Sequence, residues 1–348
     1  MDKVALWSAS DRAALFGETG AAQGLANTIV EKDFWVCWTL KRLFAISSEG
    51  GPALVFKGGT SLSKAFGAIR RFSEDIDLSF DRADLGFTGE RDPGRADLSR
   101  KQASKLLEVL QDDVRRYIRE TIYPALRCVI SEQLGEPTDR GWTLEIDADD
   151  PQAVNFYYPP AFQSGTYAGM DYIKARVRLE FGARGDPWPT ERRDIWPYAA
   201  DAYPASFEEP ACSVTVLSAR RTFWEKVTAV HAEAHRDPDR PTPQYLSRHY
   251  YDIAMLLDTE EGKTAATDFA LLAQVASHKK MFFPAAWASY ETARPGSLRI
   301  IPDETRVKDL RRDYEKMKAM IFDEPTPSFD DILERLTGLQ NAINAGHA

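Results

Sequence analysis

Phe56-Lys57-Gly58-Gly59-Thr60-Ser61-Leu62, followed by Arg71-Phe72-Ser73-Glu74-Asp75-Ile76-Asp77-Leu78, is the stretch of sequence that decides the fold. The apolar run at 53–56 predicts a short buried strand, and the Gly58-Gly59 pair predicts a turn after it. Thr60 or Ser61 suits the N-cap of a following helix that continues to Ile69. The alternation from Ile76 to Phe80 predicts a second strand. Strand, turn, helix and strand therefore follow one another directly.

The two aspartates of the second strand are candidate metal ligands. Asp75 and Asp77 are two residues apart, so their side chains share one face, while Ile76, Leu78 and Phe80 share the buried one. Two carboxylates about 5 Å apart repel by roughly 3 kcal/mol at an effective dielectric near 20. A divalent cation removes this repulsion, and Mg²⁺ (or Mn²⁺) prefers carboxylate and phosphate oxygens. We therefore expect Asp75 and Asp77 to be catalytic and to hold Mg²⁺.

The glycine turn supplies the second part of the expected chemistry. Backbone N–H groups of a glycine-rich turn that opens a helix suit a phosphate. The predicted nucleotide-binding residues are Lys57, Gly58, Gly59, Thr60 and Ser61. The Walker pattern Gly-x4-Gly-Lys-Ser/Thr is absent, so the turn is not a P-loop. Turn and carboxylates together predict phosphoryl or nucleotidyl transfer, in which positioning and charge neutralisation provide most of the catalysis.

A third carboxylate is expected on a neighbouring strand, where it orients or deprotonates the attacking hydroxyl. Glu180 lies between apolar neighbours in Val177-Arg178-Leu179-Glu180-Phe181, and Glu145 lies similarly in Leu144-Glu145-Ile146. Either glutamate can also be an exposed residue on a half-buried strand. We favour Glu180 as the catalytic residue and keep Glu145 as the alternative.

The composition is that of a globular protein with no membrane segment. Of the 348 residues, 43% are hydrophobic and 28% are charged, and no run of about 18 apolar residues exists. The formal net charge of −9 weighs against a protein coated in nucleic acid, although it allows a local basic surface. Three scattered cysteines indicate neither a disulfide framework nor a zinc site, so we expect a cytoplasmic protein.

The remaining sequence predicts an α/β half followed by a helical half. Residues 27–45 and 98–126 have helical periodicity, and strand-like runs follow at 142–146, 154–158, 172–181 and 214–217. The Pro- and Trp-rich stretch 187–210 predicts a long irregular connection. Helices are predicted at 219–235, 245–258, 267–278, 304–322 and 328–344. We expect one domain at 1–210 and a helical C-terminal domain at 211–348.

At this point the motifs resemble those of the AbiEii/AbiGii nucleotidyltransferase toxins of type IV-like toxin–antitoxin and abortive-infection systems. The resemblance rests first on Lys57-Gly58-Gly59-Thr60-Ser61-Leu62-Ser63-Lys64 and Arg71-Phe72-Ser73-Glu74-Asp75-Ile76-Asp77-Leu78. Three shorter segments support it: Glu31-Lys32-Asp33-Phe34-Trp35, Arg221-Thr222-Phe223-Trp224-Glu225-Lys226 and Arg248-His249-Tyr250-Tyr251-Asp252. The similarity runs from about residue 25 to the C-terminal helices.

The resemblance implies a nucleotidyltransferase fold, similar to that of polymerase β, with a mixed sheet. It implies phosphate binding by Gly59 and Ser61, metal ligation by Asp75 and Asp77, triphosphate contact by Lys226, and a catalytic or supporting role for Asp252. From the sequence alone, Lys226 can equally be a solvated lysine, and Asp252 can be a helix-surface partner of Arg248. The resemblance further implies an NTP substrate, tRNA as the acceptor, and a cognate antitoxin.

The predicted function is therefore a metal-dependent nucleotidyltransferase toxin that transfers NMP from an NTP to an acceptor. The expected acceptor is the 3′ end of tRNA, whose modification blocks translation. Two alternatives stay open at this point. One is a nucleotide-sugar glycosyltransferase, in which an Asp-x-Asp motif also holds a divalent metal, and the other is a binding module without catalysis.

Overall fold

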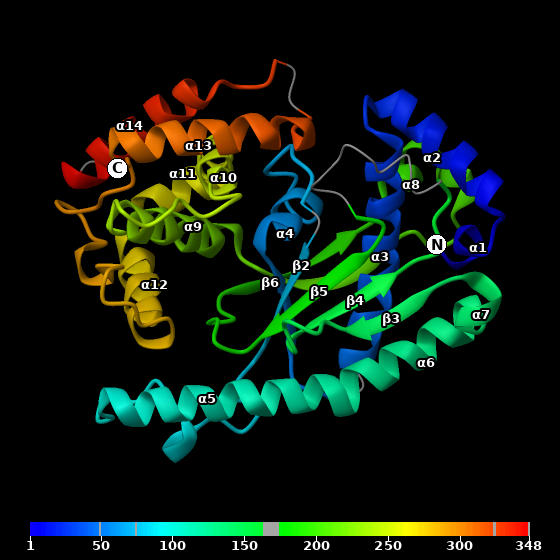
Figure 1. Cartoon of the computed structure of the whole chain (residues 1–348), viewed down its shortest axis with the longest axis horizontal. Helices are drawn as coiled ribbons and strands as arrows, with labels where there is room; N and C mark the ends of the chain where they lie inside the picture. Colours follow the sequence, from blue (N-terminus) through cyan, green and yellow to red (C-terminus); the bar gives the residue numbers. More distant parts are fainter. Residues whose placement is uncertain (49, 74, 163–173, 323–324, 347–348) are drawn as a thin grey trace. The chain divides into compact units, whose positions relative to one another are not determined.

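A mixed sheet of seven strands organises the first part of the chain (Figure 1). The computed structural model describes residues 1–348 except 49, 74, 163–173, 323–324 and 347–348. The strand order is β3-β4-β5-β2-β1-β7-β6. The strands are β1 (Leu54–Lys57), β2 (Asp75–Phe80), β3 (Thr143–Ile146), β4 (Ala153–Tyr157), β5 (Val177–Gly182), β6 (Thr190–Ile195) and β7 (Cys212–Leu217). Because β1 and β2 are antiparallel while β2 and β5 are parallel, the predicted α/β class with a mixed sheet is confirmed.

Alternating side chains divide the sheet into an apolar face and a polar face. Ile76, Leu78 and Phe80 of β2 are buried as predicted, and in β5 every second residue from Val177 is buried. The helix α3 (Asn27–Ser48) covers this apolar face (Figure 1). There, Trp35 stacks on Tyr158 and Trp38 stacks on Phe156. The opposite face carries the polar residues of β2 and β5.

Two compact units share the chain. The first comprises Met1–Ala65, Ser73–Asp92 and Leu98–Val216, and the second comprises Phe66–Phe72, Pro93–Asp97 and Leu217–Ala348. Besides α3, the helical elements of the first unit are α1 (Asp2–Ala5), α2 (Ala9–Gln23), α4 (Gly58–Lys64), η1 (Gly89–Arg91), α5 (Arg100–Tyr117), η2 (Ile118–Ile122), α6 (Tyr123–Leu134), α7 (Pro137–Arg140), α8 (Tyr198–Ala202) and η4 (Pro204–Ser206).

The second unit is helical in the residues described. Its elements are α9 (Ala219–Ala234), α10 (Ser247–Leu256), α11 (Glu260–Thr267), α12 (Phe269–Phe282), η5 (Tyr290–Thr292), α13 (Glu304–Met317), η6 (Lys318–Met320) and α14 (Phe329–Asn344). Each of the five helices predicted after residue 217 is present. The sequence did not predict α11, whose apolar residues are mostly alanines and whose Gly262 lies against the backbone of Leu256.

Three local predictions need correction or restriction. The helix α4 begins at Gly58 and ends at Lys64, and Lys57 is its N-cap without a side-chain hydrogen bond, so the predicted cap at Thr60 or Ser61 is wrong. The stretch 187–210 contains β6, α8 and η4 instead of an irregular connection. β6 escaped prediction because it is a charged edge strand with little apolar burial. Residues 172 and 173 of one predicted strand lie outside the described residues.

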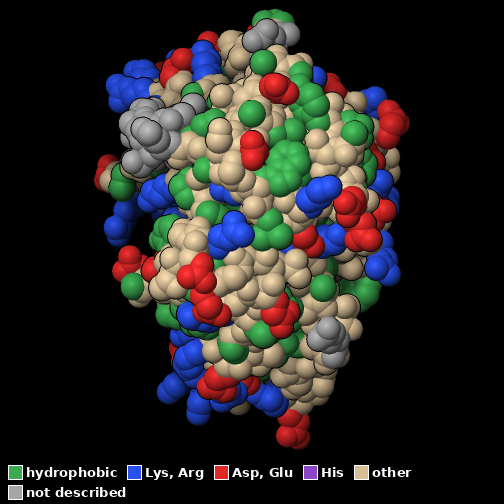
Figure 2. Space-filling model, turned by 90° about the vertical axis from the view of Figure 1, so that its right-hand side faces the viewer, with side chains coloured by type: hydrophobic (Ala, Val, Ile, Leu, Met, Phe, Trp, Pro, Cys, Tyr) green, Lys and Arg blue, Asp and Glu red, His purple; other side chains and the backbone are tan. Residues whose placement is uncertain are grey.

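No helix among the described residues is long and apolar enough to cross a membrane. All three cysteines are free thiols, with Cys37 and Cys212 buried and Cys128 exposed. On the face shown in Figure 2, basic and acidic side chains are interspersed among the described residues. Because the two charges are mixed there, a basic surface for nucleic acid on that face would be confined to a small area.

Candidate active site

Asp75 and Asp77 lie half-buried on the polar face of β2. Gly58, at the turn between β1 and α4, lies directly against the Asp77 side chain. A Cβ atom added to Gly58 would be 1.9 Å from Asp77 Oδ2 and 2.7 Å from Cγ, and Gly58 has a left-handed φ of 77°. Glycine is required here both by the backbone conformation and by the close approach. The carboxylate of Asp77 therefore faces the glycine turn.

The register of the sheet places Glu180 beside Asp77. β2 and β5 are parallel, with Asp77 opposite Glu180 and Asp75 opposite Arg178, so these side chains share the polar face. Arg178 Nε donates to Glu180 Oε1 at 2.8 Å, and its guanidinium also forms an ion pair with Asp147. Arg178 thus holds the Glu180 carboxylate on the face that carries the two aspartates.

Glu145, the alternative third carboxylate, lies farther from the aspartates. It pairs with Asn155 of β4, which pairs with Arg178 of β5, which pairs with Asp75 of β2. Three strand spacings separate Glu145 from Asp75, or about 14 Å. On this geometry Glu180 is within reach of a metal or substrate at the aspartates, whereas Glu145 is not.

The hydroxyl groups after the glycine pair bind to backbone carbonyls. Thr60 Oγ1 donates to Asp75 O at 2.5 Å, and Ser61 Oγ donates to Gly58 O at 2.9 Å. Both side chains are buried. Thr60 therefore ties α4 to the start of β2, and Ser61 closes the turn at Gly58. The two hydroxyls thus fix the position of the glycine turn relative to Asp75.

Lys226 and Asp252 form a buried ionic cluster within the second unit, together with Arg71. Asp252 has no exposed surface, and it accepts from Arg71 Nε at 2.6 Å and Arg71 Nη2 at 2.7 Å. Lys226 Nζ lies 2.7 Å from Asp252 Oδ2. Burial alone would raise the pKa of Asp252, but the two cations hold it well below its usual value. The cluster carries one excess positive charge.

The comparison with known protein families agrees with this chemistry. Residues 40–335 match the family model described as the nucleotidyl transferase AbiEii toxin of type IV toxin–antitoxin systems. The chain belongs to this AbiEii family. It is therefore a nucleotidyltransferase of the toxin class. No curated protein matches the sequence. Among solved structures, the chain is similar to MenT4, a nucleotidyltransferase toxin from Mycobacterium tuberculosis, with 16% identity, a TM-score of 0.44, and coverage of 94% of this chain and 99% of that one.

The carboxylates of this AbiEii chain fit a metal that arrives with its substrate. Among the described residues, no group of three or more His, Cys, Asp or Glu side chains is arranged to hold a metal ion by itself. Mg²⁺ is commonly bound by one or two carboxylates together with substrate phosphates and water. Asp75 and Asp77 on one face provide such a pair, and because Gly58 has no Cβ atom, the Asp77 carboxylate lies directly against the turn.

An ion pair that the sequence analysis missed anchors the helix after the glycine turn. Lys64, in the last residue of α4, lies 2.8 Å from Asp33 Oδ1, and its Nζ is 3.8 Å from the centre of the Tyr198 ring. Asp33 Oδ2 also accepts from Tyr198 N at 2.7 Å. Burial would lower the pKa of Lys64, but Asp33 raises it above its usual value. The signal was three consecutive charged residues, Glu31-Lys32-Asp33, between the apolar pairs Ile29-Val30 and Phe34-Trp35.

Arg71 is the second residue that sequence reasoning missed. It belongs to the motif quoted above, but nothing in its spacing connects it with Asp252, which lies 181 positions later. Within the second unit, Phe72 N donates to Met320 O and Phe322 N donates to Arg70 O. This short backbone pairing carries the Arg71 side chain to Asp252. The predicted alternative for Asp252, a surface pair with Arg248, does not describe its buried environment.

Proposed function

We propose that this AbiEii protein transfers NMP from an NTP to the 3′ end of tRNA in a Mg²⁺-dependent reaction (with Mn²⁺ as a substitute), and thereby blocks translation. The observation that carries the proposal is the contact between the Asp77 carboxylate and the turn at Gly58. A metal ligand and a phosphate-binding turn lie side by side, which nucleotidyl transfer requires. The family assignment favours this chemistry over glycosyl transfer by an Asp-x-Asp enzyme and over a binding module.

Each residue then has a role in the transfer. Asp75 and Asp77 bind the metal, which neutralises charge on the triphosphate when bound. Backbone amides at Gly58 and Gly59 bind phosphate oxygens, with Lys57 beside them and with Thr60 and Ser61 fixing the turn. Glu180 accepts the proton of the acceptor hydroxyl. The oxygen of that hydroxyl bonds to the α-phosphorus of the NTP, and pyrophosphate leaves.

Lys226 supplies a positive charge for the triphosphate in this proposal, and Asp252 is a positioning residue. A lysine ammonium is a compact charge suited to phosphate. Asp252 fixes the position of Lys226 through their 2.7 Å ion pair, while Arg71 donates to both oxygens of the carboxylate. Two cations against one carboxylate give the cluster a net positive charge, which would attract a polyphosphate.

The central experiment uses purified protein, total tRNA, Mg²⁺ and each labelled NTP in turn. We expect label to enter RNA with release of pyrophosphate, EDTA to halt turnover, and added Mg²⁺ or Mn²⁺ to restore it. Asp77→Asn should abolish incorporation, while Asp112→Asn on the exposed surface of α5 should leave the rate unchanged. Full activity of Asp77→Asn would contradict the proposal. Sugar transfer from a UDP- or GDP-sugar without pyrophosphate release would replace it with a glycosyltransferase.

We also propose a cognate antitoxin, a cytoplasmic location and two domains at 1–210 and 211–348. An NTP-consuming toxin that acts on tRNA needs both substrates and an inhibitor in the same compartment. Induction of the chain alone should stop growth, and coexpression of the neighbouring open reading frame should restore it. A boundary between residues 210 and 211 predicts that limited proteolysis cuts first in the connection before residue 211.

A further inference from the structure

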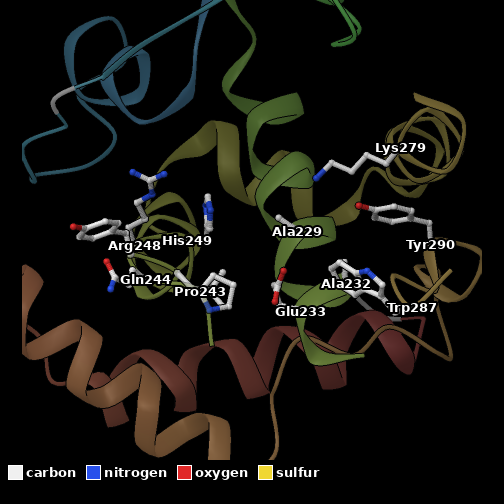
Figure 3. Close-up of a pocket in the computed structure, with 12 residues that line it drawn as sticks. Ala229, Ala232, Glu233, Pro243, Gln244, Arg248, His249, Lys279, Trp287 and Tyr290 are labelled. Carbon is white, nitrogen blue, oxygen red and sulfur yellow. The ribbon is translucent and has the colours of Figure 1, made fainter. Parts of the chain in front are cut away.

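A pocket in the helical unit has no role in the chemistry above. It lies between α9, α12, η5 and the loop that leads into α10, and its volume is about 260 Å³ (Figure 3). The residues that line it include Arg248, His249, Lys279, Trp287 and Tyr290. In Figure 3 the side chains of Arg248 and His249 come from α10, and those of Trp287 and Tyr290 come from the opposite wall.

The pocket has a net positive charge. Arg248 forms no hydrogen bond or ion pair with the described residues, and it is half-buried. Lys279 Nζ donates to the backbone oxygen of Glu225 at 2.6 Å, and its ammonium is a second positive charge in the pocket lining. The acidic residue of the pocket, Glu233, is bound at both oxygens by Arg236, at 2.6 and 2.7 Å. An anionic group is therefore the ligand that the pocket favours electrostatically.

His249 contributes a buried polar atom that the folded chain leaves without a partner. Its Nδ1 is inaccessible to solvent and has no hydrogen-bond partner among the described residues. Buried polar atoms are almost always hydrogen-bonded, so this exception, in a residue that lines the pocket, is a candidate contact for a ligand. Burial, together with the positive charges of Lys226 and Arg248, lowers the pKa of His249 well below its usual value. The ring is therefore neutral at pH 7 and able to make one specific hydrogen bond at Nδ1.

Aromatic side chains line the rest of the pocket. Trp287 is 39% exposed, and the Arg236 guanidinium covers its ring at 4.1 Å from the centre. Tyr245 also lines the pocket and has a left-handed φ of 63°, which is uncommon for an aromatic residue. Asp313 holds that conformation by accepting from Tyr245 N at 2.7 Å and Ser247 N at 2.9 Å. The wall is therefore fixed in the absence of a ligand.

We propose that this pocket binds one nucleotide of the acceptor RNA, with the base on the aromatic wall and at His249 and the phosphate at Arg248. Single-stranded RNA is recognised by stacking of unpaired bases on aromatic side chains and by cations that track the backbone. A volume of about 260 Å³ suits a single nucleotide unit and is small for a whole NTP with its triphosphate. This inference rests on the proposed function, since it assigns part of the RNA substrate to that enzyme.

Fluorescence anisotropy tests the assignment without any catalytic step. The probe is a fluorescein-labelled single-stranded RNA with the tRNA 3′-terminal sequence, measured without NTP or metal, and mant-ATP is the mononucleotide probe. Trp287→Leu and His249→Phe should each raise the RNA Kd roughly tenfold. Phe283→Leu, an exposed aromatic residue outside the pocket, should leave it within about twofold. Arg248→Gln should weaken binding and reduce its salt dependence. Mant-ATP affinity should not change in any variant.

Thermal melting confirms that each variant is folded before its Kd is compared. An unchanged RNA Kd in folded Trp287→Leu and His249→Phe would overturn the assignment, and so would a loss of mant-ATP affinity alone, which would indicate a free nucleotide. Loss of antitoxin binding with normal RNA binding would overturn it in favour of a protein contact. Because binding is measured without turnover, it stays informative if Asp77→Asn retains activity, the result that rejects the proposed function itself.

Discussion

Replacing Gly58 by alanine tests the contact between the glycine turn and Asp77. The new Cβ atom would meet Asp77 Oδ2 at 1.9 Å, whereas ordinary contacts begin at 3.4 Å, so the carboxylate must move by about 1.5 Å. A misplacement of about 1 Å at a reacting group can cost roughly 10²-fold in rate. We therefore expect Gly58→Ala to reduce kcat for pyrophosphate release about 100-fold, which corresponds to about 2.7 kcal/mol of activation free energy.

Gly86→Ala is the matched control for the backbone cost. Gly86 has φ of 79°, close to the 77° of Gly58, but its added Cβ would meet only the Arg91 guanidinium, at an ordinary 3.5 Å. Both substitutions should cost about 1–2 kcal/mol of stability, because alanine is strained at positive φ. The rates of the two variants are compared at saturating NTP, below their melting temperatures. A Gly58→Ala rate within threefold of the Gly86→Ala rate would refute the claim that Asp77 must lie against this turn.

Three further predictions follow from the described contacts. Glu180→Gln should lower kcat by roughly 10²-fold or more, while Glu145→Gln, about 14 Å from Asp75, should have no effect on kcat. Equal losses of kcat for the two variants in steady-state assays would argue against Glu180 as the base. Asp252→Asn should lower the free energy of unfolding by about 3–5 kcal/mol, because Arg71 and Lys226 would remain buried without a counter-charge. The pKa of Asp252 in the folded protein lies below its value in the unfolded protein. The stabilisation of the fold by this carboxylate is therefore present above about pH 4 and decreases as the pH falls further. Urea midpoints measured between pH 6 and 3 should decline more steeply for the wild type than for Asp252→Asn. Lys64→Met should raise KM for the NTP more than it changes kcat. In a double-mutant cycle with Asp33→Leu, the coupling free energy should be about 1 kcal/mol or more. Additive effects of the two substitutions would show that the ion pair does not position α4.

The amino-acid sequence by itself determined the local geometry of the site. The two-residue repeat of a strand fixes Asp75 and Asp77 on one face and Ile76, Leu78 and Phe80 on the other, whatever the strand packs against. Helical periodicity likewise predicted α3 and most helices of the second unit, since a 3.6-residue repeat is a property of neighbouring residues. The Gly58-Gly59 pair predicted the turn, although the start of α4 was misplaced because the capping pattern was ambiguous.

Only the tertiary structure decided which distant residues complete each cluster. The choice between Glu180 and Glu145 depends on strand order, because both glutamates have the same local alternation and only one lies on the strand next to β2. From the sequence, Asp252 could equally have been a helix-surface partner of Arg248, yet it accepts hydrogen bonds from the Arg71 guanidinium, 181 positions earlier. Lys64 and Asp33 meet only when α4 packs near α3. Periodicity is set by covalent geometry within a few residues, whereas these pairings depend on how whole elements assemble, where burial makes each unpaired charge costly and so selects its partner.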